Sequence, residues 1–530
     1  MDFYNLAIKN ISTHGDTDIF PYPIENALFF DMPDKAKGLL EDIDKNFDTW
    51  LSKYPVDTIK TCIPVGYTGF RWATLIDPLW NAYLLSEVLK ISDKIEASRI
   101  QSEKKSVFSY RVKLDEETGK IFNMDFNWRK FYDTAIEVAD KYNFVVRFDI
   151  SDFYNRVYHH RLENALQRTN ADKDIIKRIM KILQDISVNV SYGLPIGGNA
   201  SRILAEVLLN SMDQVMKSKR IQFCRFVDDY IVFADSKEDA FRKLNWCAEF
   251  LLKNEGLALQ KNKTQVQSTS EFMSHAKALI EGEEGEANKE RASFLRLHIH
   301  YDPYSSTAEQ DYNELKERLA HFDIVSLIKS EVKKSKIHQA FGKQLLSAVS
   351  HLDNPSLSLA FNVISSNLEM LYPIFPSVMQ LANKKLLDCD ENAIGIFINT
   401  LCNLVENDSY LIHTDNNASY VARILSLVNS ENTIQAIDKL NSRPSALVKS
   451  NCLYSMTNLN NHYWLSDIKA NFSTLSKWER RAFIASSYFL GDEGKHWREN
   501  TKEQFLDLEI ILRDWIASKQ PSQNSWILPL

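Results

Sequence analysis

Residues 225–233 read RFVDDYIVF, in which two adjacent carboxylates, Asp228 and Asp229, stand between two short apolar runs. The apolar runs predict a hairpin of two buried strands over 221–235, with the acids at its tip. Because aspartate is common in turns, a plain turn is one explanation of the pair. Two like charges beside a buried strand are unfavourable, however, and other parts of the chain support a second explanation.

A third carboxylate ends an earlier strand. The stretch YNFVVRFDI (142–150) is rich in β-branched and aromatic residues, which predicts a buried strand with Asp149 at its end. Asp149 and Asp228 are 228 − 149 = 79 residues apart. If both strands lie in one sheet, their carboxylates converge at one edge and repel each other unless a cation neutralises them. A pair of Mg²⁺ ions is the usual solution in phosphate chemistry, so the pattern favours nucleotidyl transfer.

Two further segments complete a series. The loop SYGLPIGG (191–198), marked by glycine and proline, leads directly into NASRILAEVLLNSMDQVMKS, an amphipathic helix. After the hairpin, the pattern predicts a helix over 237–255 and a strand-like segment, GLALQKNKTQV, over 256–266. The order along the chain is therefore acidic strand, glycine loop with helix, acidic hairpin and a lysine-bearing strand.

The remaining segments divide the chain into a part with both helix and strand patterns and a part with helix patterns alone. The N-terminal part predicts a boundary near 64–69, a helix over 72–99, a hairpin over 104–123, and helices over 127–142 and 160–187 with a loop near 169–172. From about residue 310, helical segments rich in Leu, Ile and Ala follow one another without a fixed period, as in stacked helix pairs. EGEEGEANKER (281–291) is a linker or a solvated helix.

Composition narrows the function class. A chain of 530 residues with 44% hydrophobic and 25% charged residues is typical of a globular protein of two to four domains. A net charge of −7 disfavours an indiscriminate duplex-DNA binder. No secretory signal and no apolar run long enough for a membrane span are visible, and the six cysteines form no C-x-x-C pair. We therefore expect a cytoplasmic protein with reduced thiols, no membrane contact, and neither a zinc site nor disulfides.

The series FDISDFY, GLPIGG with SRILAE, FVDD and LALQKNKT resembles motifs A to D of the reverse transcriptase palm. The resemblance covers roughly residues 60–270. It implies an α+β N-terminal polymerase with fingers and palm over 1–300, whose palm core spans about 140–270. An all-α, HEAT-like helical domain over 301–530 then takes the place of a thumb.

The same resemblance implies site residues. Asp149, Asp228 and Asp229 would hold two Mg²⁺ ions, with Mn²⁺ as a substitute; Asp228 would be the essential member of the pair and Asp229 the weaker one. Lys263 would donate a proton to the leaving pyrophosphate. A deoxynucleotide would be bound through Tyr154, which excludes a 2′-hydroxyl, through the backbone of Asp152 and Phe153, and through Gly197 and Arg71, with Arg111 as a further basic candidate.

The glycine loop departs from the templated enzymes, which usually read G-x-P-Q-G-S. Ile196 stands at the position of the glutamine and Gly198 at that of the serine. This variant, and WERRAFIASSYFLGDEGKHW (478–497), are similar to the abortive-infection reverse transcriptases of bacterial antiphage defence. That resemblance implies a cytoplasmic bacterial protein, including one encoded by a prophage, that joins dNTPs without a template.

It also implies a protein hydroxyl as primer, a single-stranded DNA product attached to the chain itself, and a homo-oligomer. Tyr4, Tyr54 and Tyr67 lie in the N-terminal part, and nothing in the sequence distinguishes a priming tyrosine among the 21 present. Two alternatives stay open: a templated enzyme of retron or group II intron type, and a helical scaffold that carries an inactive palm.

Overall fold

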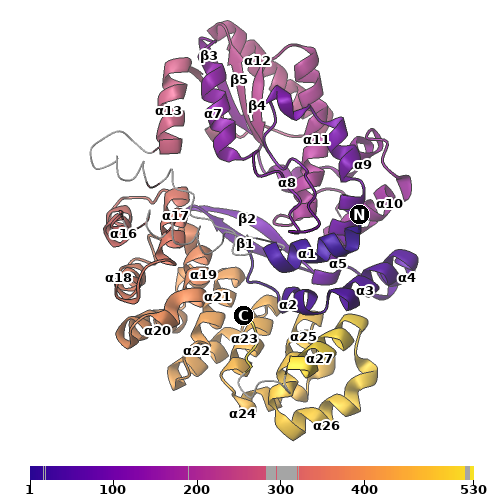
Figure 1. The fold of residues 1–530 in the computed structure, drawn as a ribbon, viewed down its shortest axis with the longest axis vertical. Coiled ribbons are helices and arrows are strands. Elements are labelled where there is room, and N and C mark those ends of the chain that lie inside the picture. Colours follow the sequence, from indigo (N-terminus) through magenta and orange to yellow (C-terminus); the bar gives the residue numbers. More distant parts are fainter. Residues whose placement is uncertain are drawn as a thin grey trace. The chain divides into compact units, whose positions relative to one another are not determined.

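A computed structural model describes residues 1–15, 17, 19–188, 190–281, 294, 315, 319, 321–519 and 526–530. The chain forms two compact units (Figure 1). Unit 1 comprises Met1–Asp18, Asn26–Thr58 and Thr74–Glu283, and unit 2 comprises Ile19–Glu25, Ile59–Ala73 and Glu284–Leu530. The predicted boundary at 300/301 and residues 282–291 of the candidate linker lie outside the described residues.

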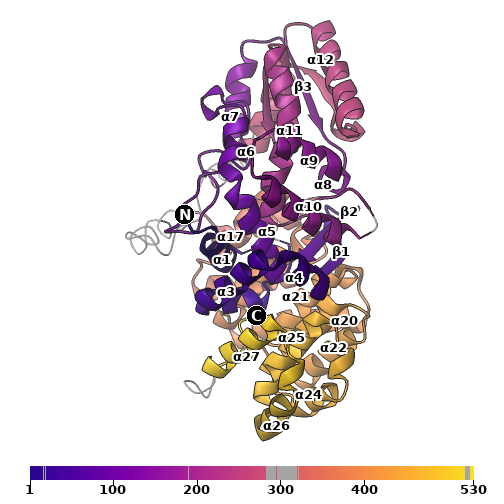
Figure 2. The ribbon, with the colours of Figure 1, turned by 90° about the vertical axis from the view of Figure 1, so that its right-hand side faces the viewer.

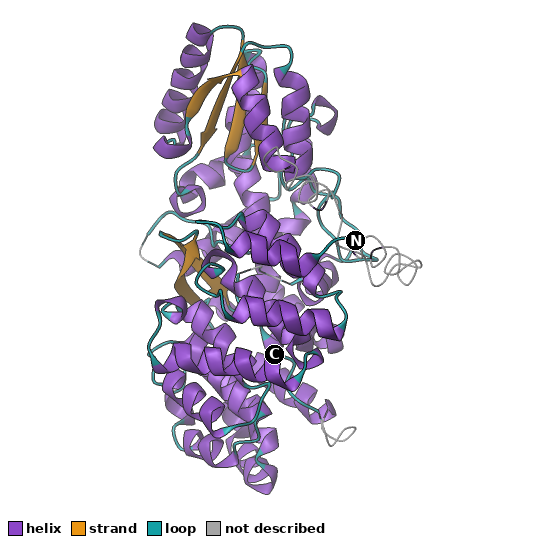
Figure 3. Cartoon of the chain, turned by 90° about the vertical axis from the view of Figure 1, so that its left-hand side faces the viewer, coloured by secondary structure: helices purple, strands orange, loops and turns teal. Residues whose placement is uncertain are grey.

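A four-stranded antiparallel sheet forms the centre of unit 1 and is drawn in orange in Figure 3. Its order is β4-β5-β3-β6. The strands span Phe144–Asp149 (β3), Phe223–Phe226 (β4), Asp229–Ala234 (β5) and Gln265–Ser268 (β6). The predicted hairpin is therefore present, and the earlier acidic strand is its direct neighbour.

Helices cover both faces of this sheet, on opposite sides of β3 in Figure 2. Trp128–Ala139 (α7) and Thr269–Glu281 (α13) enclose a core with Val145, Ile231 and Phe233. Lys237–Phe250 (α12) packs on the other face. The alternation of side chains along each strand produces the two apolar faces that these helices bury.

Pro78–Lys90 (α5) is buried along nearly its whole length. The helices that pack on it are Phe3–His14 (α1), Pro33–Lys45 (α3), Ser92–Ser98 (α6), Lys173–Ser187 (α10) and Asn199–Ser218 (α11). Unit 1 also contains Ile24–Asp31 (α2, shared with unit 2), Phe47–Lys53 (α4), Phe153–Arg156 (α8) and His159–Gln167 (α9). A mixed α/β N-terminal part is thereby confirmed.

Unit 2 carries a two-stranded sheet, Thr58–Val65 (β1) and Gly69–Ile76 (β2), followed by helices. The helices are Ile324–Val332 (α16), Gln339–Val349 (α17), Asn354–Ser365 (α18), Phe375–Lys385 (α19), Glu391–Glu406 (α20), Asp415–Leu425 (α21), Glu431–Asn441 (α22), Ala446–Asn458 (α23), His462–Lys469 (α24), Lys477–Ser486 (α25), Gly491–Thr501 (α26) and Asp507–Lys519 (α27). Helices two apart in the chain pack on each other: α17 on α19, α19 on α21, α21 on α23, α23 on α25, and likewise α16 on α18, α18 on α20 and α20 on α22.

Two local predictions need correction. Residues 72–76 continue β2 instead of beginning a helix, because Pro78 starts α5 and Asp77 caps it by accepting a hydrogen bond from the Leu79 N–H. The strand predicted over 256–266 is largely a loop with a 3₁₀ turn, and β6 begins only at Gln265. By contrast, the hairpin predicted over 104–123 is present: Val112 and Phe122 form an antiparallel bridge, and the Lys113 N–H donates to the Ile121 carbonyl at 3.0 Å.

Two expectations from composition can be compared with the fold. All six cysteines are free thiols, and Cys224, Cys247 and Cys452 are buried. Within the part of the chain that the structure describes, every helix is too short or too polar to cross a lipid bilayer.

The core of unit 1 leads to a stability prediction. Phe233, on β5, is fully buried against α7 and α13, whereas Phe241 on α12 is 52% exposed. Phe233→Ala should lower the free energy of unfolding by about 3–5 kcal/mol, because it leaves a cavity that rigid neighbours cannot fill. Phe241→Ala, the matched control, should change it by less than about 1 kcal/mol. Urea denaturation followed by circular dichroism measures both, and equal losses would contradict this picture of the core.

Candidate active site

Three carboxylates meet at one edge of the central sheet. Asp149, the last residue of β3, is the register partner of Asp229, the first residue of β5. Directly opposed residues of antiparallel strands point to the same face, so these two side chains are neighbours. Asp228 precedes Asp229 in the turn between β4 and β5. The structure thus brings the three predicted acids together.

Burial and the charges of neighbouring acids raise the pKa of two of these residues, Asp228 and Asp229. Burial, followed by the charges of Asp149 and Asp229, raises the pKa of Asp228 to about 7. Burial and the charge of Asp149 raise the pKa of Asp229 to about 6. Ionised carboxylates are thus destabilised at neutral pH unless a cation lies near them. The chemistry of this donor set fits a hard divalent cation, which prefers carboxylate oxygens.

Lys263 supplies the nearest positive charge. Its Nζ lies 2.6 Å from Oδ2 of Asp149. Partial burial would lower the pKa of Lys263, but the hydrogen bond to Asp149 and the charges of the three acids raise it. The segment that carries Lys263 is tied to the end of β3, since the Gln260 N–H donates to the Asp149 carbonyl at 2.8 Å. The lysine therefore stands beside the acids, with its side chain still 62% exposed.

The acids are not yet arranged as a coordination sphere. Among the residues placed by the structure, no three Asp, Glu, His or Cys side chains form a cluster ready to hold an ion. The Lys263 Nζ contacts Oδ2 of Asp149, an oxygen that a metal ion would also use.

Residues 152–156, which follow β3, form a wall of the candidate site next to the three acids. Asp152 has a left-handed backbone (φ 48°) and begins the short helix α8, which carries Phe153 and Tyr154. Phe153 is buried, whereas Asp152 is exposed, with its Oδ2 3.7 Å from Nε of Arg156. Burial, then the nearby Tyr110 and the charge of Asp228, raise the pKa of Tyr154 well above its usual value. Tyr154 therefore lies within electrostatic reach of the acids.

The glycine loop is attached to this wall. The Leu194 N–H donates to the Tyr154 carbonyl at 2.7 Å, and the Gly193 N–H donates to the Val157 carbonyl at 2.8 Å. Gly193 and Gly197 have φ of 103° and 125°, a region where side chains with a Cβ are strained. The loop thus needs glycine at these positions and stays close to Tyr154.

The two arginine candidates have different placements. Arg71 is exposed on β2 in unit 2, and its role at the triphosphate stays a prediction. Arg111 is buried, and its guanidinium donates to Glu96 Oε1 at 2.7 Å and to the Ile100 carbonyl at 2.6 Å. Arg111 therefore acts as an internal tie of unit 1, so the suggestion that it contacts nucleotide is not supported.

A buried ion network lies behind the hairpin, and sequence reasoning missed it. Arg225 on β4 pairs with Glu206 at 2.9 Å and with Asp213 at 2.6 Å, and Arg99 pairs with Glu206 at 2.6 Å. Burial would raise the pKa of Glu206, but the charges of Arg225 and Arg99 hold it below its usual value. An available signal was Arg225 inside an apolar strand, since a buried charge requires a partner.

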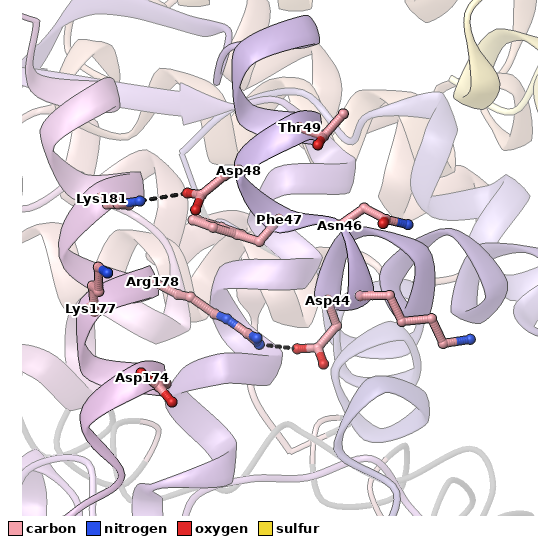
Figure 4. A pocket seen from close by; sticks show the side chains of 10 residues that line it. Asp44, Asn46, Phe47, Asp48, Thr49, Asp174, Lys177, Arg178 and Lys181 are labelled. Atoms are coloured by element: carbon pink, nitrogen blue, oxygen red, sulfur yellow. Dashed lines mark hydrogen bonds and ion pairs between the residues drawn. The ribbon is translucent and has the colours of Figure 1, made fainter.

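A separate pocket of about 380 Å³ lies between the α3–α4 junction and α10 (Figure 4). Two of its cations are paired with its own acids: Arg178 with Asp44, and Lys181 with Asp48 at 2.5 Å. None of the predicted site residues lines it. The lining residues are Asp44, Lys45, Asn46, Phe47, Asp48, Thr49, Asp174, Lys177, Arg178 and Lys181.

Comparison with known proteins identifies the domain around the acids. The family model for reverse transcriptase (RNA-dependent DNA polymerase) matches residues 83–298. No curated protein matches the chain. The assignment of a reverse transcriptase domain, and with it of a nucleotidyltransferase, therefore rests on the family model.

Solved structures similar to this chain include three structures of telomerases from two Candida species. That of Candida albicans, in complex with a fragment of telomeric RNA, is 14% identical with a TM-score of 0.30 and covers 67% of each chain. That of Candida tropicalis in the corresponding complex is 12% identical with a TM-score of 0.30, covering 73% of this chain and 68% of the telomerase. The apo form from Candida tropicalis is 12% identical with a TM-score of 0.30, covering 79% and 73%.

The raised pKa of Asp228 leads to a prediction about stability in EDTA. Its folded pKa of about 7 exceeds the ordinary 3.8, so the folded protein retains a proton that the unfolded chain releases between these values. The stability of the wild type should therefore fall as pH rises through this window. Asp228→Asn should be more stable than the wild type at pH 8, on the order of 1–2 kcal/mol, and this gain should shrink toward pH 4.

Thermal unfolding at pH 5 and pH 8 measures the difference. Asp235→Asn, an exposed acid beyond the other end of β5, is the control that should leave stability unchanged at both values. A destabilised Asp228→Asn at pH 8 would contradict the mutual repulsion of the three acids.

Proposed function

We propose that the reverse transcriptase domain of residues 83–298 is a divalent-metal-dependent DNA polymerase that joins dNTPs without a template and starts on a hydroxyl of its own chain. The requirement for a metal ion in this proposal rests on one observation: Asp149, Asp228 and Asp229 lie together at one edge of the sheet. Such acids need a cation, and nucleotidyl transfer needs metal at the same place.

In this proposal Asp149 and Asp228 are the principal ligands and Asp229 is a weaker one. When bound, two Mg²⁺ ions, or Mn²⁺ in their place, would activate the attacking hydroxyl and stabilise the leaving pyrophosphate. Lys263 is protonated beside Asp149. Its Nζ donates that proton to the pyrophosphate oxygen as the bond to the α-phosphorus breaks.

The nucleotide is held by the wall that follows β3. The backbone N–H groups of Asp152 and Phe153 bind the triphosphate, and Gly197 allows the nucleotide to approach the loop closely. Tyr154 packs under the sugar and leaves no room for a 2′-hydroxyl. The position of Tyr154 is supported by the two hydrogen bonds that join the glycine loop to the Tyr154 and Val157 carbonyls.

The composition of the glycine loop supports synthesis without a template. Ile196 has no polar group with which to contact a template base, and Gly198 has no hydroxyl. The protein primer, the antiphage role, the bacterial cytoplasmic location and a homo-oligomer follow from the resemblance to abortive-infection enzymes. The packing of alternate helices in unit 2 is consistent with a HEAT-like stack that would take the place of a thumb.

Incubation of the purified protein with labelled dNTPs and Mg²⁺, without added template or primer, tests the proposal. Label should migrate with the protein on a denaturing gel and be released by nuclease. Asp228→Asn should reduce incorporation by about 10²–10³-fold, because it removes a metal ligand, while Asp235→Asn should retain it. Mass spectrometry of the nuclease-trimmed peptide would then identify the priming residue.

Two results would decide against the untemplated reading. Faithful extension of an added RNA template and primer, with no label bound to protein, would make the chain a templated enzyme. No incorporation under either condition would favour a helical scaffold with an inactive palm.

The sugar-binding role of Tyr154 has its own test. Tyr154→Val should raise the use of rNTPs relative to dNTPs by about tenfold or more in kcat/KM, because a smaller side chain admits the 2′-hydroxyl. Tyr158→Val, at an exposed tyrosine just beyond α8, is the control and should leave this ratio unchanged. An unaltered ratio in Tyr154→Val would assign that ring to packing alone.

A further inference from the structure

Val227, immediately before Asp228, has an unfavourable backbone conformation. Its φ is 54°, in the left-handed region that favours glycine, although valine is branched at Cβ. The side chain is 7% exposed, so the residue sits inside the fold and not in a free loop. A branched residue keeps such a conformation only where its surroundings impose it.

Both backbone polar groups of Val227 are held by side chains. Its N–H donates to Oγ of Ser109 at 2.9 Å, and its carbonyl accepts from a terminal guanidinium nitrogen of Arg225 at 2.9 Å. Ser109 lies 227 − 109 = 118 residues earlier in the chain, so tertiary contacts support the turn from outside the hairpin.

Both supports are themselves anchored to α11. The Ser109 hydroxyl donates to Oε1 of Glu206 at 2.5 Å, and Arg225 donates to Glu206 and Asp213. Two arginines, Arg99 and Arg225, balance the two acids, and all four side chains are at most 2% exposed. A buried network with all these partners in place is rigid.

We propose that Ser109 and Arg225 are positioning residues that hold Val227 left-handed and so direct the Asp228 carboxylate toward Asp149. The catalytic meaning of this inference rests on the proposed function, whereas the support of the turn does not. Since α11 begins directly after the glycine loop at Asn199, one helix connects the loop to the acidic turn.

Ser109→Ala tests the proposal, because it removes one support without leaving a buried charge unpaired, as an Arg225 variant would. Ser86→Ala is the matched control: Ser86 is also fully buried in unit 1, and its hydroxyl donates to the Tyr83 carbonyl at 2.7 Å, away from the hairpin. If Ser109→Ala does not fold, Ser109→Cys, a much weaker hydrogen-bonding side chain, replaces it.

Three measurements apply to each folded variant: hydrogen exchange of the peptide spanning 223–231, Mn²⁺ binding by electron paramagnetic resonance, and steady-state incorporation. Ser109→Ala should speed exchange in that peptide by about tenfold. It should also weaken Mn²⁺ binding by about fivefold or more and lower kcat by about tenfold, with KM for dNTP within about twofold. Ser86→Ala should match the wild type in all three.

Unchanged exchange in 223–231, or faster exchange with unaltered Mn²⁺ binding, would overturn the proposal, as would the same changes in Ser86→Ala. Hydrogen exchange and Mn²⁺ binding need no turnover. If the wild type incorporates no dNTP, the proposed function fails, yet these two measurements still decide whether Ser109 holds the turn.

Discussion

The antiparallel pairing of β3 with β5 is the constraint on which the site depends. It places Asp149 opposite Asp229 and brings Asp228 to the same edge, so like charges are forced together at a partly buried place. Burial, together with this repulsion, raises the pKa values of Asp228 and Asp229. A protein keeps such an arrangement when a cation compensates it, and here Lys263 supplies part of that charge.

The sheet alone would not hold the acids in place, because a turn between two short strands is easily deformed. In this fold the turn is supported from α11 through Glu206, and α11 also continues the glycine loop, which is hydrogen-bonded to the Tyr154 segment. The acidic turn, the loop and the wall after β3 are therefore parts of one connected framework. A rigid framework of this kind is what a site with several cooperating groups requires.

Much of this architecture was predictable from local patterns. The strand ending at Asp149, the hairpin with Asp228 and Asp229 at its tip, and the helical C-terminal region all occur as expected. The expectation for one basic residue, Arg111, is not supported. Arg111 was a candidate for nucleotide contact, but its guanidinium donates hydrogen bonds to Glu96 and to the Ile100 carbonyl, because the fold buries the segment on which Arg111 lies.

The sequence by itself determined which acids are candidates for the site, since acids that interrupt apolar strands are visible as breaks in the hydrophobic pattern. It did not reveal how those acids are held. Glu206, Asp213, Arg225 and Ser109 come from distant segments, and only folding makes them neighbours. The left-handed turn at Val227 was likewise decided by tertiary structure, because valine alone disfavours that conformation and only contacts from outside the hairpin maintain it.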